Sequence, residues 1–121
     1  SLFVCDYDHN APSAEYLLKT HFRLYENYRK HRLDTPILFI SRPDYTGSDD
    51  DAQRIKVIMQ TYRKARRLGD TNVYFLSGRS FYKKNNRWDF SVDGVHPTDF
   101  GFYRMAVEIY RKIQKIDPIF K

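Results

Sequence analysis

The chain has 121 residues, of which 41% are hydrophobic and 17% aromatic, a composition that predicts one folded domain and excludes a disordered chain. No apolar run approaches the roughly 18 residues of a membrane span, so we expect a soluble protein. The net charge of +6 permits an anionic partner, but the basic segments "YRKHR" (28–32) and "YRKARR" (62–67) end predicted helices, where cations complement the helix dipole. We therefore expect no nucleic-acid partner; a basic nucleic-acid surface is the alternative.

The chain opens with a predicted strand followed by a helix. Its first residues, "SLFVC", have neither the basic region nor the cleavage site of a signal peptide, so we expect none in this chain and leave the compartment open. The run "LFVC" (2–5) predicts the strand, and Cys5, the single cysteine, is interpreted as a small buried residue. The helix is predicted over residues 13–31, with a stripe made of Leu17, Leu18, His21, Tyr25 and Tyr28.

Two more apolar runs predict strands and, with the first, the fold class. The runs "ILFI" (37–40) and "VYFL" (73–76) do not alternate with polar residues, which is typical of parallel strands buried on both faces. With helices between and after the strands, the order is β-α-β-α-β-α. That order predicts an α/β fold with a parallel sheet of about three strands and right-handed crossovers.

The second and third helices carry clear start signals. They are predicted over residues 49–68 and 99–116, with Ser48 and Thr98 as N-caps, and Gly69 suits the exit from the earlier helix. The expected core-facing residues are Ile55, Ile58, Met59, Tyr62 and Ala65 in the second helix, and Phe102, Tyr103, Ala106, Ile109, Tyr110 and Ile113 in the third.

Polar segments follow each predicted strand. They are "DYDHNAPS" (6–13), "SRPDYTG" (41–47) and the long irregular segment 77–97, which ends in "DGVHP". Ligands of open α/β sheets bind at the carboxyl ends of the strands, where these segments converge. We therefore expect Asn10 to share one edge of the sheet with the Asp-x-x-His pair at 93–96, although more than eighty residues separate them.

The pair Asp93 and His96 has a definite chemical interpretation. A histidine that acts as a general base needs a fixed tautomer, and a carboxylate that accepts from one ring nitrogen provides it. Gly94 allows the turn that brings the two side chains together, and Pro97 stiffens the approach to the helix. The alternative is a hydrogen-bonded histidine near a helix start with no chemical role.

Two stretches of the sequence resemble the SGNH hydrolase family, also called the GDSL lipase/acylhydrolase family. The segment "DGVHPTDFGFYRMA" (93–106) is similar to the last block of that family, and "LFVCDYDHN" (2–10) is similar to its third block. The resemblance implies that Asp93 is the orienting acid and His96 the base. It also implies that Asn10 helps to form the oxyanion hole, whereas an Asx turn before Pro12 is the alternative for this residue.

The resemblance also implies a fold and an activity. The family has a flavodoxin-like, three-layer α/β/α fold with five parallel strands, of which this chain would supply the third to the fifth. The implied activity is hydrolysis of acyl or acetyl esters of small molecules, carbohydrates or lipids by a Ser-His-Asp mechanism, without a cofactor.

This sequence departs from the family pattern in two places. The third block usually reads Gly-x-Asn-Asp, and here Asp8 and Ala11 stand at its ends. The nucleophilic serine of the family lies in a Gly-Asp-Ser block after the first strand, and no serine here has that context. We therefore expect residues 1–121 to form a single domain that is the C-terminal part of a larger hydrolase domain, inactive by itself. A non-catalytic flavodoxin-like binding module and a degenerate hydrolase homologue are the alternatives.

Other residues at this edge have weaker interpretations. Asp6, Asp8 and His9 contain metal-ligand chemistry, but no further His or Cys stands at ligand spacing nearby, so we expect no metal. The loops after the strands are expected to contribute substrate-binding side chains, namely Arg42, Tyr45 and Trp88.

The first strand also predicts an association surface. In the strand order of the family, the first strand lies beside the third, so Leu2–Cys5 would present an unpaired apolar edge in this chain. Unpaired edges promote pairing between chains, which predicts an oligomer through this edge.

Overall fold

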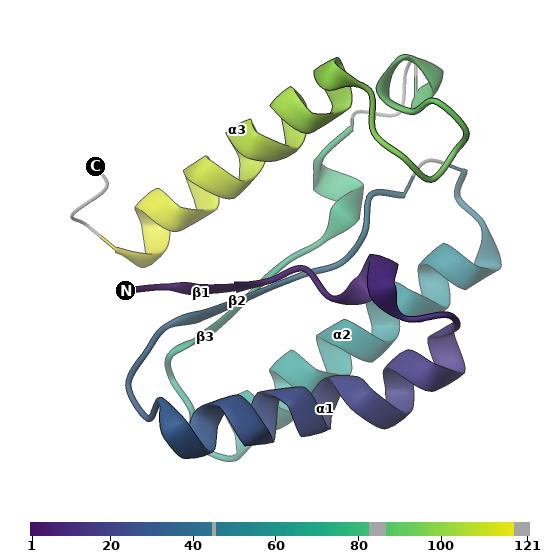
Figure 1. Ribbon diagram of the computed structural model, residues 1–121. Coiled ribbons are helices and arrows are strands. Elements are labelled where there is room, and N and C mark those ends of the chain that lie inside the picture. Colours follow the sequence, from purple (N-terminus) through teal and green to yellow (C-terminus); the bar gives the residue numbers. More distant parts are fainter. Residues whose placement is uncertain (45, 83–86, 118–121) are drawn as a thin grey trace.

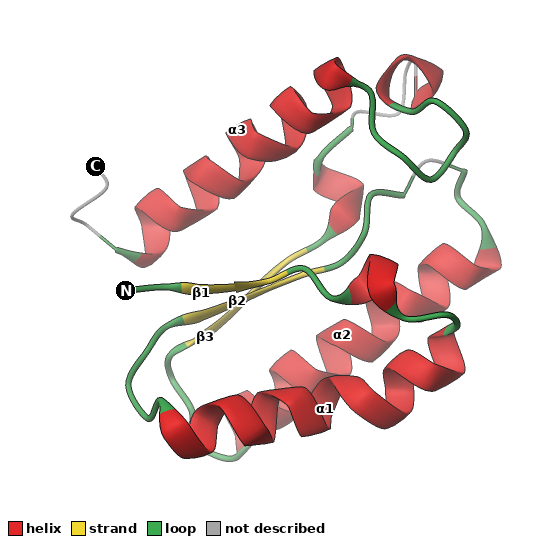
Figure 2. Ribbon diagram, in the orientation of Figure 1, coloured by secondary structure: helices red, strands yellow, loops and turns green. Residues whose placement is uncertain are grey.

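A computed structural model describes residues 1–44, 46–82 and 87–117 of the chain. These residues form a sheet with helices on both sides (Figures 1 and 2). None of the described helices is both long and apolar enough to cross a membrane. The strands are β1 (Phe3–Cys5), β2 (Ile37–Ile40) and β3 (Val73–Leu76); the α-helices are α1 (Ala14–His31), α2 (Asp49–Arg67) and α3 (Asp99–Ile116); the 3₁₀ turns are η1 (Asp8–Asn10), η2 (Gly78–Ser80) and η3 (Arg87–Phe90).

The sheet is parallel, with the described strands in the order β1-β2-β3. Phe3 lies beside Ile37, and Phe39 lies beside Phe75. All four residues of β2 are buried, as expected for a central strand covered on both faces. Helices α1 and α2 cover one face and α3 covers the other (Figure 1), so the predicted three-layer α/β/α arrangement is confirmed.

The layer of α1 and α2 packs one half of the core. Leu17 of α1 and Ile58 of α2 are fully buried against Phe39 of β2. Leu18 was predicted to share this stripe, but its side chain is 57% exposed. Leu17 and His21, one helical turn apart, lie on the buried face of α1. Successive residues of an α-helix are about 100° apart around its axis, so Leu18 points away from the sheet.

The face that helix α3 presents to the sheet only partly matches the predicted one, because Ile109 and Ile113 pack against the core as predicted but the aromatic residues do not. Gly101 and Met105 are its buried residues, whereas Tyr103 is 62% exposed. Gly101 determines this orientation, because a Cβ atom there would lie 2.3 Å from the carbonyl oxygen of Phe90. The prediction of core-facing residues in this helix is therefore wrong for all three predicted aromatic residues, Phe102, Tyr103 and Tyr110, and also for Ala106, which is exposed.

The loops after β2 and β3 are in direct contact at the carboxyl end of the sheet. The N–H of Gly78 donates to Ser41 Oγ at 2.7 Å, and a Cβ atom at Gly78 would lie only 1.7 Å from the carbonyl oxygen of Arg42. The side chain of Arg79 donates to Asp44 Oδ2 at 3.2 Å across the same loops. These contacts fix the edge of the sheet at which the candidate site lies.

Candidate active site

A closed turn before α3 positions Asp93 and His96. Ser91 and Pro97 form an isolated antiparallel bridge at its base. The hydroxyl of Ser91 accepts from the N–H of Gly94 at 2.7 Å and donates to the carbonyl oxygen of His96 at 3.0 Å. Gly94 has φ +85°, a left-handed conformation that side chains disfavour, so the predicted need for glycine in this turn is met.

Within this turn, the carboxylate of Asp93 binds both the backbone and the ring of His96. Asp93 Oδ1 accepts from the N–H groups of His96 at 2.8 Å and Val95 at 2.9 Å, and Oδ2 lies 2.6 Å from His96 Nδ1. The backbone N–H of His96, the imidazole of His96 and the N–H of Val95 together lower the pKa of Asp93 to about 2. The carboxylate is therefore an acceptor at neutral pH, so a neutral imidazole carries its proton on Nδ1 and has the lone pair on Nε2.

The pair is exposed, with relative exposures of 76% for the His96 side chain and 49% for that of Asp93. At such exposure a charge pair contributes little to the stability of the fold. Its effect is to orient the ring, and Nε2 is accessible to a reacting group.

Asn10 lies at the same edge of the sheet as this turn. It ends η1, and Figure 1 places both η1 and residues 91–98 beyond the carboxyl ends of the strands. The turn also approaches the loop after β2, because a Cβ atom at Gly94 would lie 3.7 Å from Thr46 Cγ2. Asn10 is exposed, and among the described residues none forms a hydrogen bond with its side-chain amide. The amide is therefore free to donate to a ligand at this edge.

The remaining candidates have different surroundings. The guanidinium of Arg42 forms ion pairs with Asp50 at 2.8 Å and with Asp51 at 2.7 Å. Although burial opposes ionisation of Asp51, hydrogen bonds from Arg42 and Ser48 lower its pKa below the ordinary value. Trp88 of η3 is 74% exposed, and Tyr45 lies outside the described residues. Substrate binding by these residues stays a prediction.

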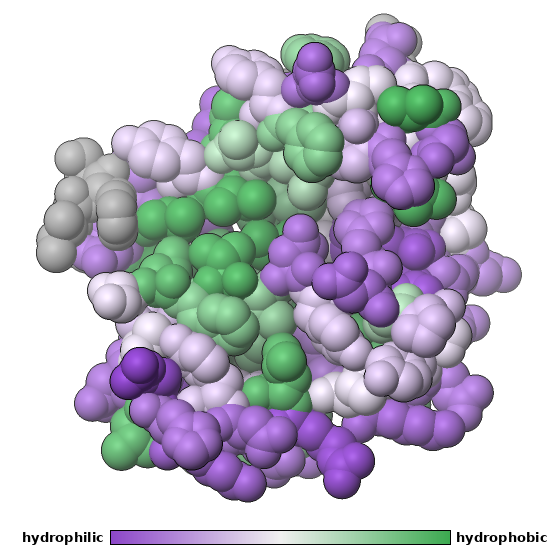
Figure 3. All heavy atoms as spheres, in the orientation of Figure 1, coloured by the Kyte–Doolittle hydropathy of each residue, from purple (hydrophilic) through white to green (hydrophobic). Residues whose placement is uncertain are grey.

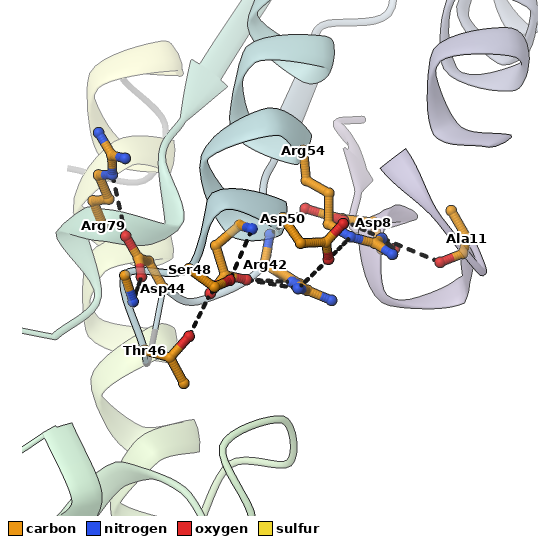
Figure 4. A network of polar contacts seen from close by, with 11 residues as sticks. Asp8, Ala11, Arg42, Asp44, Thr46, Ser48, Asp50, Arg54 and Arg79 are labelled. Carbon is orange, nitrogen blue, oxygen red and sulfur yellow. Dashed lines mark hydrogen bonds and ion pairs between the residues drawn. The ribbon is translucent and has the colours of Figure 1, made fainter. Parts of the chain in front are cut away.

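A buried ion pair at this edge was not predicted from the sequence. Asp8 is fully buried in η1, and its Oδ1 lies 3.1 Å from Nη1 of Arg54, which is itself 4% exposed (Figure 4). The stripe of α2 held the signal, because Arg54 precedes Ile58 by one helical turn and thus occupies a core-facing position. Among the described residues, no group of three His, Cys, Asp or Glu side chains is arranged to hold a metal ion.

Each serine after the first is used in a structural hydrogen bond, and Cys5 is protected by burial. Burial raises the pKa of the Cys5 thiol to about 11, which makes it a poor nucleophile. Ser13 and Ser48 cap helices. In the loops after β2 and β3, hydrogen bonds to nearby backbone groups are formed by Ser41, Ser77 and Ser80. Ser91 closes the turn of His96.

Comparisons with known proteins test the family and the fold. A family model described as the GDSL-like lipase/acylhydrolase family matches residues 1–114. A crystal structure described as a GDSL-like lipase from Bacteroides ovatus superimposes with a TM-score of 0.82 at 25% identity, over 95% of this chain and 35% of that one. A salicylyl-acyltransferase, SsfX3, from a tetracycline biosynthetic pathway superimposes with a TM-score of 0.72 at 17% identity, over 95% of this chain and 37% of that one.

The matches cover nearly all of this chain but only part of the solved structures. The chain spans only about a third of the length of the two solved structures. None of the curated proteins compared with the chain matches it. The family model nevertheless covers nearly all of the 121 residues, including both segments that carry the resemblance. The chain therefore belongs to the GDSL-like lipase/acylhydrolase family.

Proposed function

We propose that this chain is the C-terminal part of a serine esterase that hydrolyses acyl or acetyl esters. The observation that carries the proposal is the 2.6 Å contact between Asp93 Oδ2 and His96 Nδ1, in a turn that leaves Nε2 accessible. An imidazole in this state is a general base for a hydroxyl nucleophile.

The proposed nucleophile is a serine outside this chain. The hydroxyls of Ser13 through Ser91 have structural partners, and Ser91, the nearest to the pair in sequence, binds the backbone of His96 rather than its ring. In the proposed protein, an N-terminal part carries the serine in a Gly-Asp-Ser block. We accordingly propose that the 121 residues alone do not hydrolyse esters.

The proposed reaction proceeds through an acyl-enzyme. The serine oxygen attacks the ester carbonyl while Nε2 of His96 takes its proton, and Asp93 stabilises the imidazolium that forms. The amide of Asn10 donates to the oxyanion of the tetrahedral intermediate, an interaction that contributes about 2.7–4 kcal/mol per donor in comparable sites. His96 then gives the proton to the leaving alcohol, and water releases the acid in a second cycle of the same steps.

The proposed substrates are esters of small molecules, carbohydrates or lipids. The exposed indole of Trp88 in η3 offers an apolar and aromatic contact for such groups beside the turn of His96. Cleavage of an ester by this route requires no metal or organic cofactor, because the base and the oxyanion donor are side chains of this chain.

The test is a substitution of His96 in the longer protein that contains this chain. His96→Ala should lower kcat/KM for p-nitrophenyl acetate by a factor on the order of 10⁴ or more, because the base is lost. The matched control is His31→Ala, since His31 is an exposed histidine at the end of α1, near the amino end of the sheet, and its loss should leave turnover unchanged. Undiminished turnover in His96→Ala would refute the assigned role and favour a binding module or a degenerate homologue.

A further inference from the structure

A single guanidinium nitrogen holds both sides of the turn that carries Asn10. Nη1 of Arg54 donates to the carbonyl oxygen of Asp8 at 3.0 Å and to that of Ala11 at 3.1 Å. These two carbonyls stand before and after Asn10 in the chain. Figure 4 shows Arg54 reaching from α2 to both of them. The backbone around Asn10 is thus fixed by a side chain from a different element.

The guanidinium is itself held in place by carboxylates. Nη1 also lies 3.1 Å from Asp8 Oδ1, and Nε donates to Asp50 Oδ2 at 2.7 Å. The other oxygen of Asp8, Oδ2, accepts from the backbone N–H of Arg42 at 2.8 Å. Charge-assisted hydrogen bonds of this kind are stronger and more directional than neutral ones, and the side chains of Asp8 and Arg54 are almost completely buried.

We propose that Arg54 and Asp8 are positioning residues for ester hydrolysis, because their ion pair fixes the direction in which Asn10 presents its amide. This inference rests on the proposed function, since the direction matters only if Asn10 binds the oxyanion. Oxyanion donors act at distances of about 2.7–3.1 Å, and a displacement of about 1 Å can cost up to 100-fold in rate. A clamp on the flanking carbonyls therefore acts on kcat without any contact to the substrate.

The experiment is a double-mutant cycle between Arg54 and Asn10 in the longer protein that contains this chain. Asn10→Ala should lower kcat for p-nitrophenyl acetate about 100- to 1,000-fold through loss of the donor. Arg54→Lys keeps the charge but lacks the fork of donors, and it should lower kcat about 10- to 100-fold with KM changed less than about twofold. In the Asn10→Ala background, Arg54→Lys should change kcat less than about twofold, because the group that it positions is gone.

Arg29 offers a matched control. It is a partly buried arginine of α1 that pairs with Asp70 at 2.8 Å. Its Nη1 donates to three backbone carbonyls at the amino end of the sheet, as that of Arg54 donates to two; these belong to Arg32, Leu33 and Thr35. Arg29→Lys should lower the melting temperature about as much as Arg54→Lys while leaving kcat unchanged. This comparison separates a loss of stability from a loss of position, with rates normalised to the folded fraction from circular dichroism.

The outcomes distinguish the two proposals. Equal losses of kcat from Arg54→Lys with and without Asn10, or a loss that appears in KM, would overturn the positioning role and leave the esterase assignment intact. Activity that survives His96→Ala would instead overturn the proposed function and, with it, this inference. Should Arg54→Lys not fold, Asp8→Asn enters the same cycle, since it removes one of the two carboxylate charges that hold the guanidinium and should show the same dependence on Asn10.

Discussion

At the scale of residues, the candidate site depends on which groups the two oxygens of Asp93 bind. Asp93 uses Oδ1 for two backbone N–H groups and Oδ2 for the ring of His96, so the turn and the imidazole are fixed by the same group. The partners stabilise the charged form, which is why the pKa of Asp93 is lowered to about 2. The carboxylate of Asp93 therefore stays ionised well below the ordinary pKa of 3.8.

A pH titration followed by ¹³C NMR of the carboxyl carbons tests the lowered pKa of Asp93. A lowered pKa means that the interaction stabilises the fold above the ordinary value of 3.8 and is lost as the pH falls from 3.8 through about 2. Asp93 should thus show a midpoint near 2. In His96→Ala, the backbone donors remain, and the midpoint should rise only part of the way to 3.8. A midpoint at 3.8 in the unmodified protein would contradict the geometry of the turn.

At the scale of elements, the packing of α1 on α2 encloses a histidine. His21 is fully buried, with Nδ1 at 2.9 Å from Thr61 Oγ1 and its ring against Phe39. Within the described part of the chain, its Nε2 is buried without a hydrogen-bond partner. Burial lowers the pKa of His21 to about 4, so the ring is neutral in the folded protein at neutral pH.

The expected result is a fold that loses stability in mild acid. The unfolded chain takes up a proton at the ordinary pKa of 6.5 and the folded chain only near 4, so stability falls as the pH decreases from 6.5 towards 4 and then levels off. Urea unfolding should give a free energy of unfolding about 2 kcal/mol lower at pH 5 than at pH 8. The difference should shrink in His21→Leu and persist in His31→Ala. An equal pH dependence in His21→Leu would assign the effect to other groups.

At the scale of the whole molecule, an apolar surface extends from β1 to α3. Figure 3 shows apolar side chains gathered between these two elements and over the edge of the sheet. Val4 is 37% exposed on this edge strand, and Leu2 and Ile113 are only partly buried beside it. An apolar surface next to an unpaired strand edge favours association with another chain.

We expect the 121-residue chain by itself to associate through this surface. Size-exclusion chromatography with light scattering should show a mass that rises with protein concentration. Val4→Lys places a charge on the edge and should shift the chain towards the monomer. Leu68→Lys is the control, because Leu68 is 68% exposed after the end of α2 and its replacement should leave the mass unchanged. A monomer at high concentration in the unmodified chain would refute the prediction.

Local patterns explain which features could be predicted from the sequence. The strands follow from continuous apolar runs, and Ser48 and Thr98 cap their helices as predicted, because a cap involves residues only three positions apart. The contact between Asp93 and His96 is equally local. The resemblance to the family also rests on local segments, namely residues 2–10 and 93–106.

The features that were missed depend on how distant elements are placed. Asp8 and Arg54 are 46 positions apart, and their contact requires the rotation of α2 and its position along β1, which no local pattern specifies. Helix α3 has apolar residues on two faces, so periodicity alone did not select the face that packs on the sheet. The close approach of Gly101 to Phe90 selected it, and that approach is visible only in three dimensions.

The turn from Ser91 to Pro97 closes on itself. Its antiparallel bridge, the hydrogen bonds of the Ser91 hydroxyl and the contacts of the Asp93 carboxylate all lie within seven consecutive residues. Asp93 and His96 are consequently aligned by contacts within this turn alone, whatever the arrangement of the rest of the sheet. In the proposed esterase, folding must still set the distance and the angle between this turn and the hydroxyl of the nucleophile. Under that proposal, the two parts of the esterase can shift relative to each other while the contact between Asp93 and His96 stays intact.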